Sequence, residues 1–158
     1  MNKFLVLSGI ILIAAMSRLF PHIPNFTPIG AMALFGGVYY QDKRLAFLMP
    51  LICMFISDLI LGFHSTMIFV YSSFILTTGL GLLIRNYFNL FTLLSGSIIS
   101  SILFYLITNF GVWTQSDLSL SSVYFLGLPF LTPTLFGDLF YNLILFGSFY
   151  FIQEKKLV

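Results

Sequence analysis

The sequence has few charged residues. Asp, Glu, Lys and Arg make up 8% of its 158 positions, whereas soluble domains carry about 25%. Hydrophobic residues account for 59%, and the mean hydropathy is +1.03. A fold of this size has too few polar residues to cover its surface in water, so a water-soluble enzyme and a nucleic-acid-binding protein are excluded. Disorder is excluded because it requires low hydrophobicity. We expect an all-α membrane protein with one integral membrane domain over residues 1–158.

Cysteine and catalytic motifs are also scarce. Cys53 is the only cysteine, so it forms neither an internal disulfide nor a multi-cysteine zinc site. We expect a buried inert thiol, and a soft ligand to cobalt or another metal is the alternative. The chain lacks a GxxxxGK[ST] phosphate loop, an HExxH motif and a GxSxG motif. We therefore expect no ATP hydrolysis, no cofactor and no enzymatic activity.

Apolar runs separated by turns predict about six transmembrane helices. The runs cover residues 4–20, 27–40, 45–63, 66–84, 90–113 and 134–152. The second run is short, because the prolines at 21, 24 and 28 cannot continue a helix. Its roughly 14 residues give about 21 Å of helix, against about 30 Å of hydrocarbon. A cleaved signal peptide is the alternative for the first run.

The segment between the fifth and sixth runs is mixed in character. Residues 114–133 combine polar and apolar positions and contain two further prolines. We expect an external loop here, with an interfacial or re-entrant helical turn around residues 123–130.

The basic residues predict the orientation of the chain. In a six-helix arrangement with cytoplasmic termini, only Arg18 lies on the outer face. The cytoplasmic face then holds Lys3, Lys43, Arg44, Arg85, Lys155 and Lys156. This asymmetry follows the positive-inside rule and supports six crossings.

The same arrangement brings the unusual polar residues into the outer half of the bilayer. The residues concerned are Arg18, His22, Asn25, Asp58, His64, Asn109, Trp113, Asp138 and Asn142. The inner halves of the helices are almost purely apolar. We therefore expect an amphiphilic cavity that opens outward.

Each of these residues also has a structural explanation. A carboxylate near a helix centre costs about 2.5–3.5 kcal/mol, so Asp58 and Asp138 need partners or water. An Asp–Arg pair that only joins helices would satisfy this need. His22 and His64 could simply be solvated, and Trp113 stands where tryptophan commonly anchors a helix at the headgroups. The clustering of these residues favours function.

Four segments carry a resemblance to a known family. They are PHIPNFTPIGAMALFGG at 21–37, SDLILGFH at 57–64, TNFGVW at 108–113 and GDL at 137–139. Together they resemble a small family of bacterial membrane proteins described as transport proteins. That family in turn resembles the substrate-binding S components of energy-coupling factor (ECF) transporters, which have six helices, a proline-containing entry to a short second helix and a ligand site near the outer face.

The resemblance implies roles for particular residues. Asp58, His64, Asn109, Trp113 and Asp138 would line or gate an outer substrate pocket, and His22 and Asn25 would act as a lid. A coupling transmembrane subunit and ATPases would be the partners, beside the lipid bilayer of the bacterial inner membrane. The small residues on the first two helices that would face this subunit are Gly9, Ala14, Ala33 and Gly37.

The sequence therefore predicts a membrane transport subunit that binds a small solute. Two acids and two histidines suit a cationic or metal-containing ligand, whereas Trp113 and nearby aromatic residues suit a flat, vitamin-like ring. An assembly or interaction protein without a ligand is one alternative. A proton-coupled carrier that uses Asp58 and Asp138 as relay groups is the other.

Overall fold

The computed structural model describes residues 2–21 and 23–155, and within these residues it is entirely helical. Polar side chains define several helix starts: Asp42 caps α3 (Lys43–Leu61), and Asn89 forms a capping box with Thr92 at the start of α5 (Leu90–Trp113). A short 3₁₀ turn, η1 (Arg85–Tyr87), follows α4. The α-helices are α1 (Lys3–Ser17), α2 (Ile29–Tyr39), α3 (Lys43–Leu61), α4 (Met67–Ile84), α5 (Leu90–Trp113) and α6 (Leu120–Glu154).

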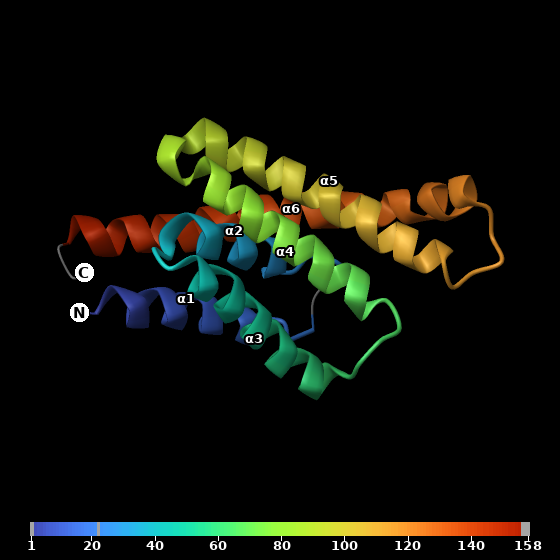
Figure 1. Ribbon diagram of the computed structural model, residues 1–158, viewed down its shortest axis with the longest axis horizontal. Helices are drawn as coiled ribbons and strands as arrows, with labels where there is room; N and C mark the ends of the chain where they lie inside the picture. The colour runs from blue at the N-terminus through green and yellow to red at the C-terminus, as the bar shows by residue number, and fades with distance from the viewer. Residues whose placement is uncertain (1, 22, 156–158) are drawn as a thin grey trace.

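The connections between helices gather at two ends of the molecule (Figure 1). The start of α1, the end of α6, the α2–α3 turn and the α4–α5 turn lie at one end, which we call the terminal end. The segment between α1 and α2, the α3–α4 loop and the α5–α6 loop lie at the other, which we call the pocket end. The basic residues Lys3, Lys43, Arg44, Arg85 and Lys155 belong to the terminal end, and Lys156 lies outside the described residues.

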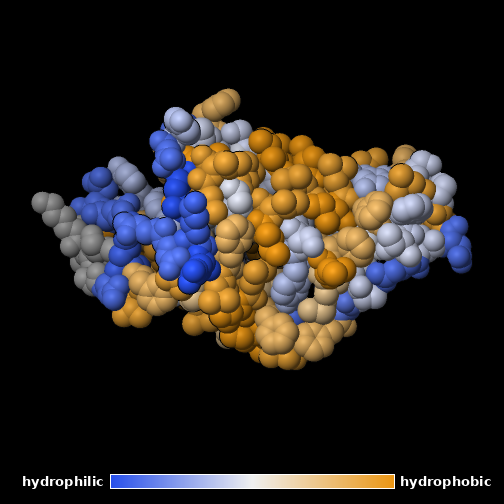
Figure 2. Space-filling model, viewed as in Figure 1, coloured by the Kyte–Doolittle hydropathy of each residue, from blue (hydrophilic) through white to orange (hydrophobic). Residues whose placement is uncertain are grey.

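Four helices, α3 to α6, are long and apolar enough to cross a membrane, counting η1 with α4. The two others, α1 and α2, are apolar but shorter. On the face shown in Figure 2, apolar side chains cover the middle of the molecule, and hydrophilic side chains gather mainly at the terminal end. These features are those of a helical membrane protein.

Helix α2 is the buried centre of the bundle. It packs against α1, α3, α4, α5 and α6, and nine of its 11 residues are buried. A helix that is apolar on every side is stable only when other helices surround it. Its Gly37 lies so close to Gly81 of α4 that a Cβ atom on either glycine would collide with the backbone of the other helix.

Most of the small residues expected to face a coupling subunit are instead buried within this chain. Ala14 and Ala33 are buried, and Gly37 faces α4. A Cβ atom at Gly9 would meet nothing within 4 Å. The close helix approach that Ala33 and Gly37 permit is therefore made with α4 of the same molecule.

The expectation of a loop over residues 114–133 was wrong for residues 120–133, although the helical turn expected around residues 123–130 is part of a helix. Only residues 114–119 form the connection, and α6 runs unbroken through Pro129 and Pro133. Packing against α5 explains how the helix tolerates the two prolines, because neighbouring helices stabilise such irregular segments. The Tyr105 hydroxyl of α5 donates to the Tyr124 carbonyl of α6, and the Tyr124 hydroxyl donates back to the Leu106 carbonyl at 2.6 Å.

Candidate ligand pocket

The main cavity has a volume of about 450 Å³ and lies at the pocket end. This volume is within the range of about 300–1,000 Å³ that is typical of small-molecule sites. Helices α2 to α6 all contribute to its wall, together with Arg18, which caps α1. The lining residues are Arg18, Asn25, Thr27, Ile29, Met54, His64, Thr66, Val70, Phe104, Thr108, Asn109, Val112, Leu118, Val123, Leu126, Gly127 and Phe130.

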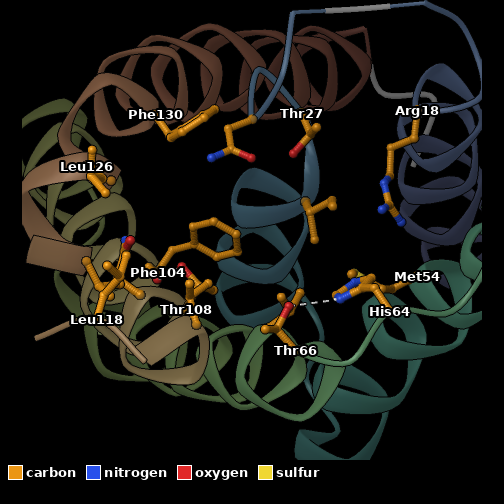
Figure 3. A pocket seen from close by; sticks show the side chains of 17 residues that line it. Arg18, Thr27, Met54, His64, Thr66, Phe104, Thr108, Leu118, Leu126 and Phe130 are labelled. Atoms are coloured by element: carbon orange, nitrogen blue, oxygen red, sulfur yellow. Dashed lines mark hydrogen bonds between the residues drawn. The ribbon is translucent and has the colours of Figure 1, made fainter. Parts of the chain in front are cut away.

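The pocket lining mixes polar and apolar side chains (Figure 3), since Met54 lies beside His64 and Thr108 lies near Leu118. Arg18 and His64 lie on one side. Leu118, Leu126 and Phe130 lie together on the other. A solute with separate polar and apolar parts would therefore find a matching surface for each.

The segment between α1 and α2 forms part of the pocket rim. Asn25 and Thr27 line the cavity, and Asn25 has a left-handed backbone with φ 64°. Between them, Phe26 packs on the rings of Phe140 and Tyr141 of α6, at centroid distances of 5.6 and 5.7 Å. This aromatic contact fixes the segment to α6 and so holds the two polar side chains at the pocket.

Arg18 and Asp58 form an ion pair beside the pocket. The Nη1 atom of Arg18 donates to Asp58 Oδ1 at 3.0 Å and also to the Ser57 hydroxyl. The Tyr71 hydroxyl of α4 donates to Asp58 Oδ2 at 2.8 Å. Asp58 is 1% exposed, so its charge is satisfied by the protein. The pair joins the end of α1 to α3, and Tyr71 extends the network to α4.

One edge of the Arg18 guanidinium has no hydrogen-bond partner among the described residues. Both hydrogen bonds that Arg18 donates to described residues come from Nη1. The Nε atom is buried and has no hydrogen-bond partner among residues 2–21 and 23–155. Orphaned buried donors are uncommon in native structures and call for an explanation. Arg18 lines the pocket, which makes a bound solute one candidate partner.

Asp138 lies in a second, smaller cavity of about 20 Å³. This volume is sufficient for about one water molecule. Asn25, Thr27 and Phe104 line both cavities, so the two adjoin. Asp138 is 4% exposed, and its Oδ2 accepts a hydrogen bond of 2.6 Å from Ser101 of α5.

Glycine at position 30 makes room for the Asp138 carboxylate, since a Cβ atom there would collide with it. Gly30 belongs to the first turn of α2, where the helix dipole favours a negative charge. In the part of the chain that the structure describes, Asp138 makes no ion pair. One turn further along α6, Asn142 donates from Nδ2 to Ser97 at 2.9 Å.

The predicted site residues thus fall into three groups. His64, Asn25 and Asn109 line the main pocket, and His64 Nδ1 is hydrogen-bonded to Thr66 at 3.0 Å. Asp138 lines the adjoining small cavity. Asp58 accepts a hydrogen bond from Arg18 and lines neither cavity. Trp113 is also outside both, and its ring packs on Phe110 at 5.4 Å. His22 lies outside the described residues.

Sequence reasoning missed most of the apolar wall. On α5, Phe104, Thr108 and Val112 recur every four residues and line one side of the pocket. On α6, the wall continues through residues 123, 126, 127 and 130. The same helical spacing is visible in the sequence. It was not recognised because residues 123–130 were expected to form only an interfacial or re-entrant helical turn within an external loop.

The described residues contain no group of three or more His, Cys, Asp or Glu side chains that could hold a metal ion. Cys53 is buried in the apolar core with Phe35 and Phe149 and lines neither cavity.

Comparison with known proteins assigns the chain to a family. Residues 1–158 match the family described as a family of unknown function, DUF6580. The chain belongs to DUF6580. Neither the curated proteins nor the solved structures contain a match to this DUF6580 protein.

Proposed function

We propose that this DUF6580 protein is a membrane transport subunit that binds a small solute in the main pocket. The observation that carries the proposal is the cavity of about 450 Å³, to which five helices and the residue capping α1 contribute. A cavity that depends on so many elements is costly to maintain in a small helical protein. Hydrophilic residues in an apolar helical bundle are typical of solute pathways.

The resemblance to ECF S components supports the same proposal. Six helices, a proline-containing entry to a short second helix and a pocket at one end of the bundle are the shared features. We propose that all six helices cross or enter the bilayer of a bacterial inner membrane, with the terminal end in the cytoplasm. The basic residues at that end support this orientation. A coupling transmembrane subunit and ATPases would then supply the energy.

The direct test is to identify the solute. The full chain is purified in a mild detergent, and small molecules that stay bound are released and analysed by mass spectrometry. We expect one compound in near-stoichiometric amount. An empty protein that also shows no thermal shift with vitamins, organic acids or metal ions would contradict the proposal and would favour an assembly or interaction protein.

A matched pair of variants shows whether the solute occupies the pocket. Thr108→Trp places a bulky ring inside the cavity, whereas Ile102→Trp places the same ring on α5 at a position that is 42% exposed and outside the pocket. We expect retention of the solute to be lost in the first variant and kept in the second. Equal retention in both would contradict this location.

A proton-coupled carrier is the second candidate, and Asp138 favours it. This buried carboxylate adjoins the main pocket and makes no ion pair with the described residues, as is typical of proton relays. In proteoliposomes, an imposed pH gradient would then drive accumulation of the retained solute without any ATPase. Asp138→Asn would abolish this accumulation. A gradient without effect would exclude the carrier.

A further inference from the structure

We propose, on the basis of the function proposed above, that the solute is an amphiphilic organic acid. Its carboxylate would bind the Nε–Nη2 edge of Arg18, and its apolar body would lie against α5 and α6. This proposal replaces the cationic or metal-containing ligand that the number of acids and histidines suggested.

The geometry of Arg18 is the first argument. Asp58 and Ser57 engage Nη1, which leaves Nε and Nη2 to present two N–H groups side by side. Such an edge matches the two oxygens of a carboxylate in a bidentate pair. Nε is buried and has no partner in the described chain, and a carboxylate that seats against this edge would supply that partner. A neutral amide has one acceptor oxygen, so it would accept a hydrogen bond from only one of these two N–H groups.

The charges around the pocket are the second argument. Among the described residues that line it, Arg18 is charged and none is Asp or Glu. Asp58 lines neither cavity and is paired with Nη1 of Arg18 and with Tyr71, and Asp138 belongs to the adjoining cavity. A cationic or metal ligand would therefore find no carboxylate in the main pocket, whereas an anion would find donors.

The start of α4 adds to this preference. Its N-cap residue, Thr66, makes no side-chain capping bond and is hydrogen-bonded to His64 instead. Both residues line the pocket, so the uncapped, positive end of the α4 dipole lies at the same wall. The opposite wall, with Leu118, Leu126 and Phe130 (Figure 3), offers apolar surface to the rest of the solute.

Three probes with one apolar body test the charge preference. They are 4-phenylbutyrate, its uncharged amide 4-phenylbutyramide and the cation 4-phenylbutylamine. Binding of each to the full chain in detergent is measured by ligand-detected NMR competition at constant ionic strength. We expect the carboxylate to bind at least tenfold more tightly than the amide and the amine.

Variants of Arg18 test the geometry. Arg18→Lys keeps a positive charge opposite Asp58 but removes the planar two-donor edge. We expect the tenfold preference for the carboxylate to disappear in Arg18→Lys. The double variant Arg18→Gln with Asp58→Asn leaves no unpaired charge and should lose the preference as well. Arg44→Gln, an exposed arginine at the terminal end, is the matched control and should keep it.

The outcomes separate this inference from the proposed function. Equal binding of the three probes, or tighter binding of the amine, would overturn the organic acid while leaving the pocket as a solute site. No binding of any probe at millimolar concentration would also overturn it, and the retained solute would then decide the function. A preference that survives Arg18→Lys would overturn the role of the Nε–Nη2 edge.

Discussion

Arg18 and Asp58 are joined by a 3.0 Å ion pair that links the C-cap of α1 to α3. The two side chains are 12% and 2% exposed, so the pair is largely withdrawn from water. Removing one member of a buried pair leaves the other charge without compensation. Losing one member is therefore strongly destabilising, whereas replacing both members by apolar residues of similar volume often costs nothing.

We therefore expect Asp58→Asn to destabilise the protein by about 3–5 kcal/mol. Thermal unfolding of the purified chain, followed by intrinsic fluorescence, measures the loss. Adding Arg18→Gln to Asp58→Asn should restore much of the stability, because no unpaired charge is left. A single variant that melts like the wild type would show that the pair contributes little.

The second aspartate should behave differently. Asp138 has no basic partner among the described residues, so Asp138→Asn removes a charge without exposing another. We expect the melting temperature of this variant to stay close to that of the wild type or to rise. A collapse as severe as that of Asp58→Asn would reveal a cationic partner for Asp138.

The contact between Gly37 and Gly81 should tolerate no side chain. A methyl group at Gly81 would collide with the Leu34 carbonyl and with Gly37 Cα, and backbone atoms cannot move aside as a flexible side chain can. We expect Gly81→Ala to cost at least about 1–3 kcal/mol, the range for overpacking. Thermal unfolding again provides the measurement.

Gly79→Ala is the control on the same helix. A Cβ atom there meets nothing within 4 Å, so the gain in helix propensity should make this variant neutral or slightly stabilising. If both alanine variants unfold alike, the close approach of α2 and α4 does not limit stability.

Arg85 caps the C-terminus of α2. Its side chain donates to the Gly37 and Tyr40 carbonyls, which a helix C-terminus otherwise leaves without partners. We expect Arg85→Gln to lower stability by about 1.5–3 kcal/mol, since hydrogen bonds to charged groups contribute about this much. The exposed Arg44→Gln should have no effect on the same melting curve.

The two tyrosines between α5 and α6 should control how firmly the start of α6 is held. Tyr105→Phe together with Tyr124→Phe removes both hydroxyl-to-carbonyl bonds and keeps the rings. We expect faster hydrogen exchange across residues 120–133 than in the wild type, and little change in α3. Unchanged exchange would show that apolar packing alone holds this segment.

Much of the architecture could be predicted from the sequence. The fifth predicted run coincides with α5, and the predicted ends of α3 and α4 are within two residues of the observed ones, because polar turns such as residues 41–44 interrupt long apolar runs. The start of α6 was missed because Pro129 and Pro133 are usually helix breakers. Their toleration depends on contacts with α5 that the local sequence does not contain.

Local sequence patterns could not predict which side chains pair inside the site. Arg18 is 40 residues from Asp58, and Ser101 is 37 residues from Asp138. The sequence identified the polar residues and offered an Asp–Arg pair between helices as one explanation, and the Arg18–Asp58 pair confirms that explanation for Asp58. It did not indicate that one aspartate is neutralised by an arginine and the other is not, since this difference arises from how the helices pack.

The shortness of α2 has an electrical consequence. Its 11 residues span about 16 Å at 1.5 Å per residue, from the pocket at Ile29 to the Tyr40 carbonyl held by Arg85. In the proposed orientation, and with water in the pocket, an applied transmembrane voltage would fall mainly across this thickness rather than across about 30 Å of hydrocarbon. The local field would then be roughly doubled, and an anion bound at Arg18, as proposed, would lie near the pocket-side edge of that field.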